Sequence, residues 1–510
     1  MPPDADAPPC WRTRLLWLMG ITLLLRGVVA WGMHFGVDEA YAVAVARPLS
    51  LGYLDHPPAV FWLSALGEWL SGGREPWWLR LPFLLAFTGT TWLMARVGDH
   101  LFGAPAGFWT AVVVNVAGML GVTAGSWILP DGPLLLGSAL CGWGIARGCF
   151  PRHSGERVAR WWVLAGVGAA MAALSKYHAI FLPVGVAGYL LTTPALRPQL
   201  RTRGPWLAAL VALPGALPTL WWNATHGWAS FRFQGARALP TGGWSPAPVL
   251  EMVGGQLGYL LPWVALPLWW AVWRAARTPG DLRARLLLWL GAGPVVLFTV
   301  IALLGRRGLP HWTAMGYLLL APLLGAQLAE AWRMRRRWPV RWGWGSGVAT
   351  AVLALVLVSA VRTGWATRGR TPDPTAEALG WDAVADSLLA MRLPDGQPPA
   401  FAATVHWMHA GKLGAALGDA LPLVVVAEDR RHFHYRAGAP RREGAVGVLV
   451  RLAPRDGRAL EPWMTAPYAR VTRLSDLAVT RGAARVAPVE RYLVVTRGGV
   501  PPRHPGGGVP

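Results

Sequence analysis

The sequence is 510 residues long, is 54% hydrophobic and only 15% charged, and contains 32 Trp. Its apolar residues fall in repeated runs of about 20, the length that a bilayer-spanning helix needs, which excludes an ordinary soluble protein. The formal net charge of +22 comes from Arg clusters between these runs, as in cytoplasmic loops of membrane proteins, so we expect no nucleic-acid partner.

Hydropathy predicts about eleven spans. Their centres lie near residues 23, 90, 113, 140, 168, 186, 213, 267, 295, 321 and 352. The first apolar run, Leu15 to Trp31, is interpreted as a span because no small-residue cleavage site of a signal peptide follows it. Cys10, Cys141 and Cys149 fit no disulfide framework or metal spacing.

The placement of Arg predicts the orientation of the spans. Arg-rich loops follow the fourth, sixth, eighth and tenth spans and should face the cytoplasm. The opposite loops hold nearly all the distinctive polar groups. We therefore expect these polar loops and the C-terminal domain to share the non-cytoplasmic face, which in a bacterial inner-membrane protein is the periplasm.

The first outer loop carries three acids, one His and two Tyr: Asp38, Glu39, Tyr41, Tyr53, Asp55 and His56. A partly desolvated carboxylate beside an apolar helix has a raised pKa and suits a general base. The structural alternative is a solvated loop in which Asp38 caps the next helix.

Two later outer positions carry a single charge each. Asp131 lies at the mouth of the fourth span, where an N-cap is the simpler interpretation. Lys176 ends the fifth span in a chain with 46 Arg and two Lys. A compact ammonium there suits a phosphate, although a snorkelling interfacial cation fits equally well.

The loop after the seventh span, Trp221 to Gln234, mixes aromatic rings with amide, imidazole and guanidinium groups at Asn223, His226, Arg232 and Gln234. Aromatic faces and amides suit a sugar, whereas an interfacial aromatic belt would explain the Trp residues alone.

A later outer loop holds two cations and an imidazole: Arg306, Arg307 and His311. Cations on the outer face oppose the charge rule and indicate an anionic ligand such as a lipid phosphate, unless the topology is wrong by one span.

Composition divides the chain into a transmembrane domain (1–362), a small extracytoplasmic α/β domain (363–497) and a disordered tail (498–510). In the second domain, His406, His409, His432 and His434 are interpreted as surface or packing residues. The sequence contains no P-loop, Rossmann glycine pattern, HExxH or Cys/His zinc pattern.

With these residues in view, the sequence resembles the bacterial family 39 glycosyltransferases, which include relatives of protein mannosyltransferases and of lipid A aminoarabinose transferases with the GT-C fold. The resemblance covers about residues 10–335. Its motifs are Asp38-Glu39-Ala-Tyr41, Tyr53-Leu-Asp55-His56-Pro57-Pro58, Arg80-Leu-Pro82, Pro130-Asp131-Gly-Pro133-Leu134, Ser175-Lys176-Tyr177, Trp222-Asn223 to Phe233-Gln234, and His311-Trp312. It implies an α-helical polytopic, GT-C-like fold with a small C-terminal α/β domain.

The resemblance also implies an inverting transfer from a polyprenyl (undecaprenyl) phosphate sugar to an envelope lipid, glycan or protein. Asp38 would be the general base and Glu39 its support, while Lys176 and Arg306 or Arg307 would neutralise the departing phosphate. The residues expected to bind substrate are Tyr41, Tyr53, Asp55, His56, Arg80, Asp131, Lys176, Tyr177, Asn223, His226, Arg232, Gln234, Arg306, Arg307 and His311.

No metal or other cofactor is expected to be required, although the resemblance leaves a divalent cation open. Ala42 stands where many relatives carry a second Tyr, which leaves the acceptor contacts open. The alternative function is a transporter or lipid flippase, which would place ionisable groups near mid-span and show repeated halves.

Overall fold

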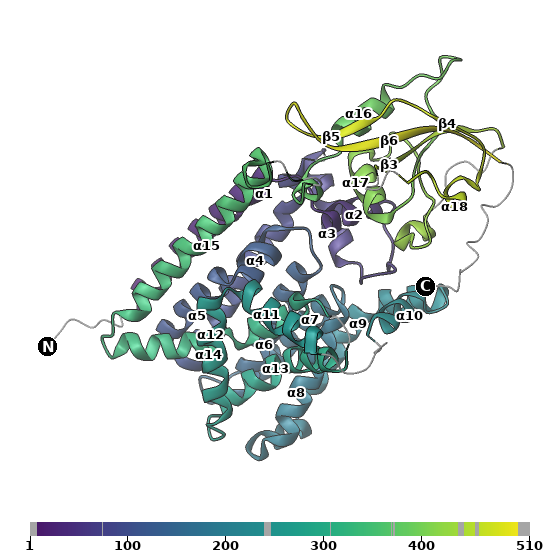
Figure 1. Ribbon diagram of the computed structural model, residues 1–510. Helices are drawn as coiled ribbons and strands as arrows, with labels where there is room; N and C mark the ends of the chain where they lie inside the picture. The colour runs from purple at the N-terminus through teal and green to yellow at the C-terminus, as the bar shows by residue number, and fades with distance from the viewer. Residues whose placement is uncertain are drawn as a thin grey trace.

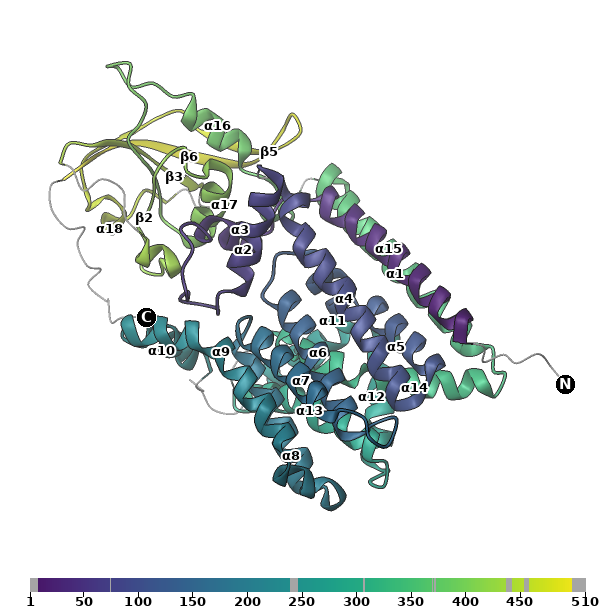
Figure 2. The same ribbon diagram turned by 180° about the vertical axis from the view of Figure 1, so that it is seen from behind.

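The computed structural model describes residues 8–73, 75–238, 246–305, 308–368, 370, 373–436, 443–453 and 458–497. A long bundle of helices forms most of the molecule, and a small α/β domain lies at one end of it (Figure 1). The first and last bundle helices, α1 (Pro8–Gly32) and α15 (Trp338–Thr363), run side by side along one edge (Figure 2). The α/β domain therefore begins at the end of the bundle where the loop after α1 also begins.

The remaining elements of the bundle lie between α1 and α15 in the sequence. They are α4 (Pro76–Phe102), α5 (Ala104–Val116), η1 (Gly118–Ala124), α6 (Asp131–Cys149), α7 (Val158–Ala173), η2 (Tyr177–Ile180), α8 (Phe181–Thr192), η3 (Pro194–Arg201), α9 (Arg203–Thr225), α11 (Pro246–Leu260), α12 (Pro262–Ala276), α13 (Leu282–Leu303), η4 (Pro310–Thr313) and α14 (Ala314–Arg333). Each predicted span centre falls within a helix. Helices are expected here because lipid cannot satisfy backbone N–H and C=O groups.

Within the described part of the chain, five helices are long and apolar enough to cross a membrane, or up to eight if each bent helix pair is one span. The bent pairs are α5 with η1, η2 and α8 with η3, and α11 with α12. The chain is a multi-pass membrane protein, and the count of about eleven spans stays a prediction.

Small residues bring the bundle helices close together. A Cβ added to Gly137 of α6 would lie 2.6 Å from the backbone nitrogen of Ala172 in α7. In membranes such close backbone approach drives helix association. The outer surface, by contrast, exposes large apolar side chains such as Leu24, Leu210 and Trp344, as expected for contact with lipid.

The Arg-rich loops share one end of the bundle. Arg152 forms an ion pair of 3.0 Å with Asp99, at the end of α4. Arg283 donates to the carbonyl of Leu101 at 2.8 Å, and Arg285 donates to the carbonyl at the end of α8. These loops therefore lie opposite the end that carries the α/β domain.

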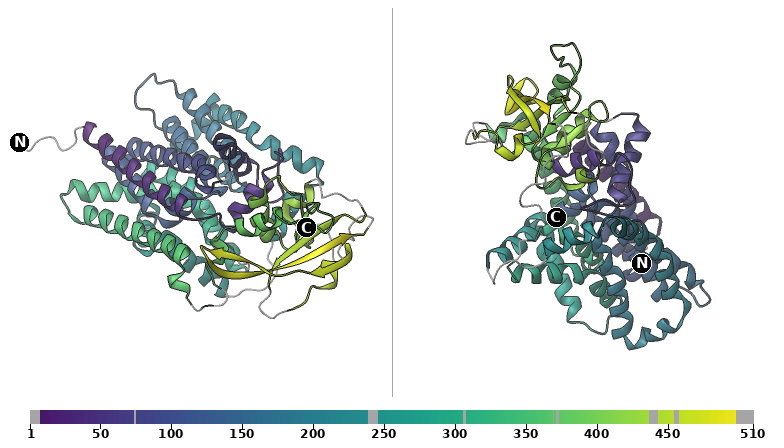
Figure 3. Two further views of the ribbon diagram at one scale, coloured as in Figure 1. Left: turned by 90° about the horizontal axis from the view of Figure 1, so that it is seen from above. Right: turned by 90° about the vertical axis from the view of Figure 1, so that its right-hand side faces the viewer.

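The α/β domain contains η5 (Trp365–Thr367), η6 (Ala376–Ala378), α16 (Asp382–Leu389), β1 (Ala402–Thr404), α17 (Trp407–Leu417), β2 (Leu423–Val425), η7 (Arg431–Tyr435), β3 (Val446–Leu452), α18 (Pro462–Thr465), β4 (Tyr468–Arg473), β5 (Leu477–Arg481) and β6 (Ala484–Thr496). Its sheet has the order β2-β1-β3-β6-β4, and β5 also pairs with β6. β1 is parallel to β2 and β3, whereas β3 and β6 are antiparallel. The domain stacks on the end of the bundle (Figure 3), and the predicted fold class is confirmed.

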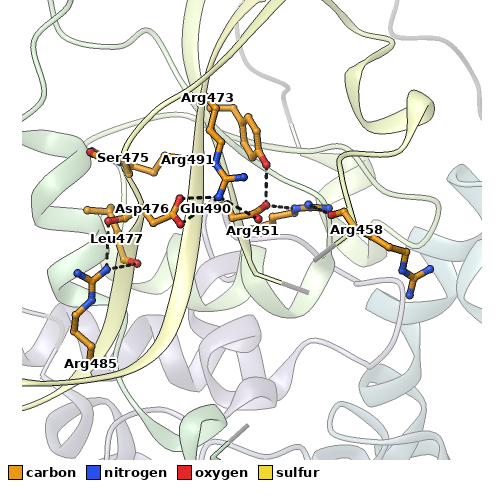
Figure 4. Close-up of polar contacts among 10 residues, drawn as sticks. Arg451, Arg458, Arg473, Ser475, Asp476, Leu477, Arg485, Glu490 and Arg491 are labelled. Carbon is orange, nitrogen blue, oxygen red and sulfur yellow. Dashed lines mark hydrogen bonds and ion pairs between the residues drawn. The ribbon is translucent and has the colours of Figure 1, made fainter. Parts of the chain in front are cut away.

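A buried ion pair joins the two long strands of this sheet (Figure 4). Arg451 of β3 donates from Nε to Oε2 of Glu490 on β6 at 2.7 Å. The hydroxyl of Tyr492 donates to the same oxygen at 2.8 Å, and Arg473 lies 3.5 Å from the other oxygen. Because the carboxylate has several donors, its burial in the sheet is compensated.

Two segments that the sequence left as loops form helices at the domain interface. The first outer loop contains α2 (Val37–Val45) and α3 (Ala59–Ser71), and the loop after α9 contains α10 (Ala229–Ala238). α17 of the α/β domain packs directly on α2. This contact is close because Gly411 has no side chain: a Cβ there would lie 2.9 Å from the backbone of Tyr41.

We predict that Gly411→Ala loosens the α/β domain from the bundle. The added methyl meets backbone rather than a movable side chain, so we expect a cost of about 1–3 kcal/mol and a lower apparent Tm in detergent. Gly345→Ala is the matched control because nothing lies within 4 Å of a Cβ at that position. Equal melting temperatures for the two variants would contradict the prediction.

Candidate active site

A buried ion pair lies beneath the first outer loop. Arg80 of α4 donates from Nε and Nη2 to the two carboxylate oxygens of Glu39 on α2, at 2.7 and 2.6 Å. The same oxygens accept backbone N–H groups of Gly36 and Ile128, at 2.8 and 2.9 Å. Burial favours a raised pKa for Glu39, but Arg80 and these N–H donors outweigh it and lower the pKa. Glu39 is thus ionised and fully engaged, which favours a positioning role over a reacting one.

Arg80 also closes the end of α1. Its Nη1 donates to the carbonyls of Ala30 and Met33, and its Nη2 donates to the carbonyl of His34, at 2.6–2.9 Å. The last carbonyls of a helix lack partners within the helix, so a buried guanidinium there is well satisfied. The sequence predicted that Arg80 binds substrate. In the structure Arg80 is fully buried, and the hydrogen bonds described here all go to protein atoms.

Asp38 lies beside this pair on α2 and behaves differently. Its side chain is exposed, and within the described residues its carboxylate forms no hydrogen bond or ion pair. Desolvation by the surrounding protein nevertheless raises the pKa of Asp38, while the charges of Arg431, Arg237 and Lys176 oppose that shift. An accessible carboxylate with a raised pKa suits a general base, and this role of Asp38 stays a prediction.

Asp55 connects the first outer loop to the other elements. The hydroxyl of Tyr41 donates to its Oδ1 at 2.8 Å, and Nη1 of Arg431 lies 4.0 Å from its Oδ2. The side-chain amide of Gln234, on α10, donates to the backbone carbonyl of Asp55. Burial raises the pKa of Asp55 to about 6. The predicted residues Tyr41, Asp55 and Gln234 therefore lie together.

Tyr53, from the same loop, is a packing residue in this structure. Its ring stacks on Phe61 at a centroid distance of 3.8 Å, and its hydroxyl accepts the backbone N–H of Ser50 at 3.1 Å. The centre of its ring also lies 4.5 Å from that of His432, with the two rings tilted against each other. His432 is itself buried and accepts the backbone N–H of Leu54 at 3.3 Å, which fits the packing role expected for it.

A second buried pair lies at the ends of α6 and α7. Nζ of Lys176 donates to both carboxylate oxygens of Asp131, at 2.9 and 3.0 Å. The imidazoles of His56, His178 and His311 lie close enough to interact electrostatically with this pair or with one another. Burial lowers the pKa of His56 to about 3, so its imidazole is neutral. The sequence did not predict that Asp131 and Lys176 would be partners.

The predicted sugar-lining segment begins with a buried turn. Asn223 donates from Nδ2 to the carbonyl of Thr219 at 2.9 Å, and its Oδ1 accepts the N–H of Phe231 at 3.1 Å. Asn223 is fully buried and fixes the angle between α9 and α10. His226 stacks on Trp222 at a centroid distance of 4.3 Å.

The other predicted side chains of this region differ in their setting. The hydroxyl of Tyr177 hydrogen-bonds to that of Ser230 on α10 at 2.5 Å, which ties η2 to α10. Arg232 is exposed on α10. Arg306 and Arg307 lie outside the described residues, so their predicted phosphate role has no structural description.

Two arginines close to Asp38 and Asp55, Arg431 and Arg237, were not among the residues predicted from the sequence. Arg431 lies in η7 of the α/β domain, where no site residue was expected, and its backbone φ is 50°. Its signal was the segment Arg430-Arg-His-Phe-His-Tyr435, whose mixture of aromatic and basic residues resembles that of residues 221–234. Arg237 is the last basic residue of α10.

Comparisons with known proteins agree with this fold. Residues 55–222 match the family described as dolichyl-phosphate-mannose-protein mannosyltransferase. The crystal structure of ArnT from Cupriavidus metallidurans bound to undecaprenyl phosphate has a TM-score of 0.66 at 17% identity, covering 96% of this chain and 98% of that chain. Its apo structure has a TM-score of 0.63 at 17% identity, covering 94% and 97%. Together with the curated relative below, these matches bear out the resemblance: the chain is a glycosyltransferase with the GT-C fold and is similar to the PMT-like enzymes.

A curated relative is more specific. The lipid A galacturonosyltransferase RgtD of Rhizobium johnstonii is 27% identical over 334 residues, which cover 64% of this chain and 67% of the relative. This chain is therefore similar to that enzyme over about two thirds of each sequence.

We predict that Glu39→Gln destabilises the protein. The change leaves the buried Arg80 charge without its partner, for which we expect a cost of about 3–5 kcal/mol in thermal unfolding experiments. Glu68→Gln is the control because Glu68 pairs with Arg47 where both side chains are partly exposed, so its loss should be smaller. A stable but inactive Glu39→Gln would instead indicate a direct role in transfer.

Proposed function

We propose that this protein transfers a sugar from a polyprenyl phosphate to a cell-envelope acceptor, with inversion at the anomeric carbon. The observation that carries the proposal is Asp38: an accessible carboxylate without a hydrogen-bond partner in the described chain, next to a buried and fully paired Glu39. A fixed helix thus presents one carboxylate that is available to react.

In the proposed step, Asp38 accepts the proton of an acceptor hydroxyl as that oxygen attacks the anomeric carbon. The bond from the anomeric carbon to the phosphate oxygen breaks, and the polyprenyl phosphate leaves with both bonding electrons. Products are the glycosylated acceptor, the lipid phosphate and the proton held by Asp38. Inversion follows because attack and departure occur on opposite faces of the sugar.

We place the phosphate near Lys176. Its ammonium is bonded to Asp131 in this structure, so a phosphate there would share the cation with that carboxylate. The neutral imidazole of His56, whose Nδ1 is buried without a described partner, adds a polar group beside the pair. The solved ArnT complex with undecaprenyl phosphate supports a polyprenyl phosphate as the lipid carrier. The proposal needs no metal, and this remains an expectation.

The acceptor and the cellular location belong to the same proposal. The likeness to a lipid A galacturonosyltransferase favours an envelope lipid as acceptor and makes an acidic sugar a candidate for transfer. The Arg-rich loops at the opposite end of the bundle favour a cytoplasmic position for that end. We therefore infer that the site and the α/β domain face the periplasm from a bacterial inner membrane.

We predict that Asp38→Asn folds normally and loses transfer by about 10²- to 10⁴-fold, because an amide cannot accept the proton. The measurement is transfer of labelled sugar from undecaprenyl-phosphate sugars to lipid A by the purified protein in detergent. Asp395→Asn, at an exposed position of the α/β domain, is the control. Equal turnover by Asp38→Asn and wild type would remove Asp38 from the mechanism.

A second prediction concerns pH. The base must be ionised, and desolvation raises the pKa of Asp38 above that of a free aspartate. The value of kcat/KM should therefore be maximal above this raised pKa and fall as the pH drops through it. In Asp38→Asn the residual transfer should lack this fall. An unchanged pH profile in the variant would assign the titration to another group, such as Asp55.

A further inference from the structure

The α/β domain contributes a charged side chain to the end of the bundle that carries Asp38. Arg431 extends from η7 and places Nη1 4.0 Å from Asp55 of the first outer loop. Its guanidinium carbon lies 4.4 Å from the ring centre of Trp407, on α17, and 5.0 Å from that of Phe233, on α10. Arg431 is therefore held between a helix of the α/β domain and a helix of the membrane domain.

A second guanidinium contacts the same aromatic ring. Arg237 of α10 lies 5.5 Å from the ring centre of Phe233. Burial lowers the pKa of Arg237, and the charge of Arg431 lowers it further, as expected for neighbouring cations. The charges of both arginines also act on Asp38. Two partly buried cations beside one ring create a positive potential that favours an anionic ligand.

Arg431 is held in place at an energetic cost. Its backbone φ of 50° lies in the left-handed region, which a residue with a side chain seldom adopts. The docking of α17 supports it: Nζ of the buried Lys412 donates to the carbonyl of Phe35, across the interface with the first outer loop, and to the carbonyl of Leu379 within the α/β domain. Asp429, which pairs with Nε of Arg431 at 2.9 Å, is itself exposed. Arg431 thus has a strained backbone, packs between two aromatic rings and lies near the proposed base. These properties are typical of a ligand-binding residue.

We propose that Arg431, assisted by Arg237, binds a carboxylate carried by the transferred sugar, so that the donor is a uronic-acid sugar on a polyprenyl phosphate. This inference rests on the proposed function. The phosphate end of the donor lies with Lys176 and Asp131 at the ends of α6 and α7, whereas Arg431 approaches from the α/β domain. A planar guanidinium matches a carboxylate in two parallel hydrogen bonds. One sugar ring would then connect two anion sites, with Asp38 beside the reacting carbon.

The test compares two donors that differ only at C6: undecaprenyl phosphate carrying galacturonic acid or galactose. The wild type should prefer the acidic donor in kcat/KM. In Arg431→Gln the ratio of the two kcat/KM values should fall by about 10- to 100-fold, the loss of one charge-assisted contact. Arg431→Lys should recover part of the ratio. Arg430→Gln is the matched control, because Arg430 donates to the carbonyl of Ala427 and its loss removes the same charge.

Three outcomes would overturn the inference. A wild type without preference between the donors excludes recognition of the carboxylate. Equal losses on both donors in Arg431→Gln indicate a structural or phosphate-binding role. A loss that disappears when lipid A lacking its phosphates is the acceptor places Arg431 on the acceptor instead. Failure of the wild type to use any polyprenyl-phosphate sugar would instead refute the proposed function.

Discussion

The site depends on the ion pair between Glu39 and Arg80. A guanidinium at the start of α4 holds the carbonyls at the end of α1 and the carboxylate near the start of α2, so three segments meet at one buried point. Burying either charge alone would cost several kcal/mol, whereas in the pair both the carboxylate and the guanidinium are satisfied by hydrogen bonds. The pair fixes the position of α2 relative to α1 and α4. The neighbouring residue on α2, Asp38, is therefore held at the end of the bundle.

The α/β domain is part of the site rather than an appendage. Its helix α17 packs on α2 through Gly411, and its turn η7 places Arg431 against Asp55 and the ring of Phe233. The same turn donates the N–H of His432 to the hydroxyl of Tyr41, which in turn donates to Asp55. Residues from the first outer loop, α10 and the domain thus share one polar network, and displacement of the domain would alter the electrostatics around the proposed base.

Charge is arranged differently at the two ends of the bundle. At one end, arginines of short loops contact carbonyls and acids at the ends of neighbouring helices. At the other, the charged groups are buried in pairs, Glu39 with Arg80 and Asp131 with Lys176, around accessible side chains. A transporter would be expected to place such groups near mid-span. Their position at helix ends agrees with the proposed transfer between a lipid-borne donor and an acceptor.

The sequence by itself determined that the protein is polytopic, where most of its long apolar helices lie, that its basic loops share one face, and that its motifs resemble those of GT-C glycosyltransferases. These properties follow from local composition and short motifs, which hydropathy and periodicity report directly. Only the tertiary structure decided which charged groups are partners. Arg80 looked like a substrate ligand and proved to be fully engaged by protein, Lys176 proved to be bonded to Asp131, and Arg431 reached the site from a domain to which no function had been given. Such pairings depend on how helices distant in the sequence pack together, and a one-dimensional pattern does not contain that information.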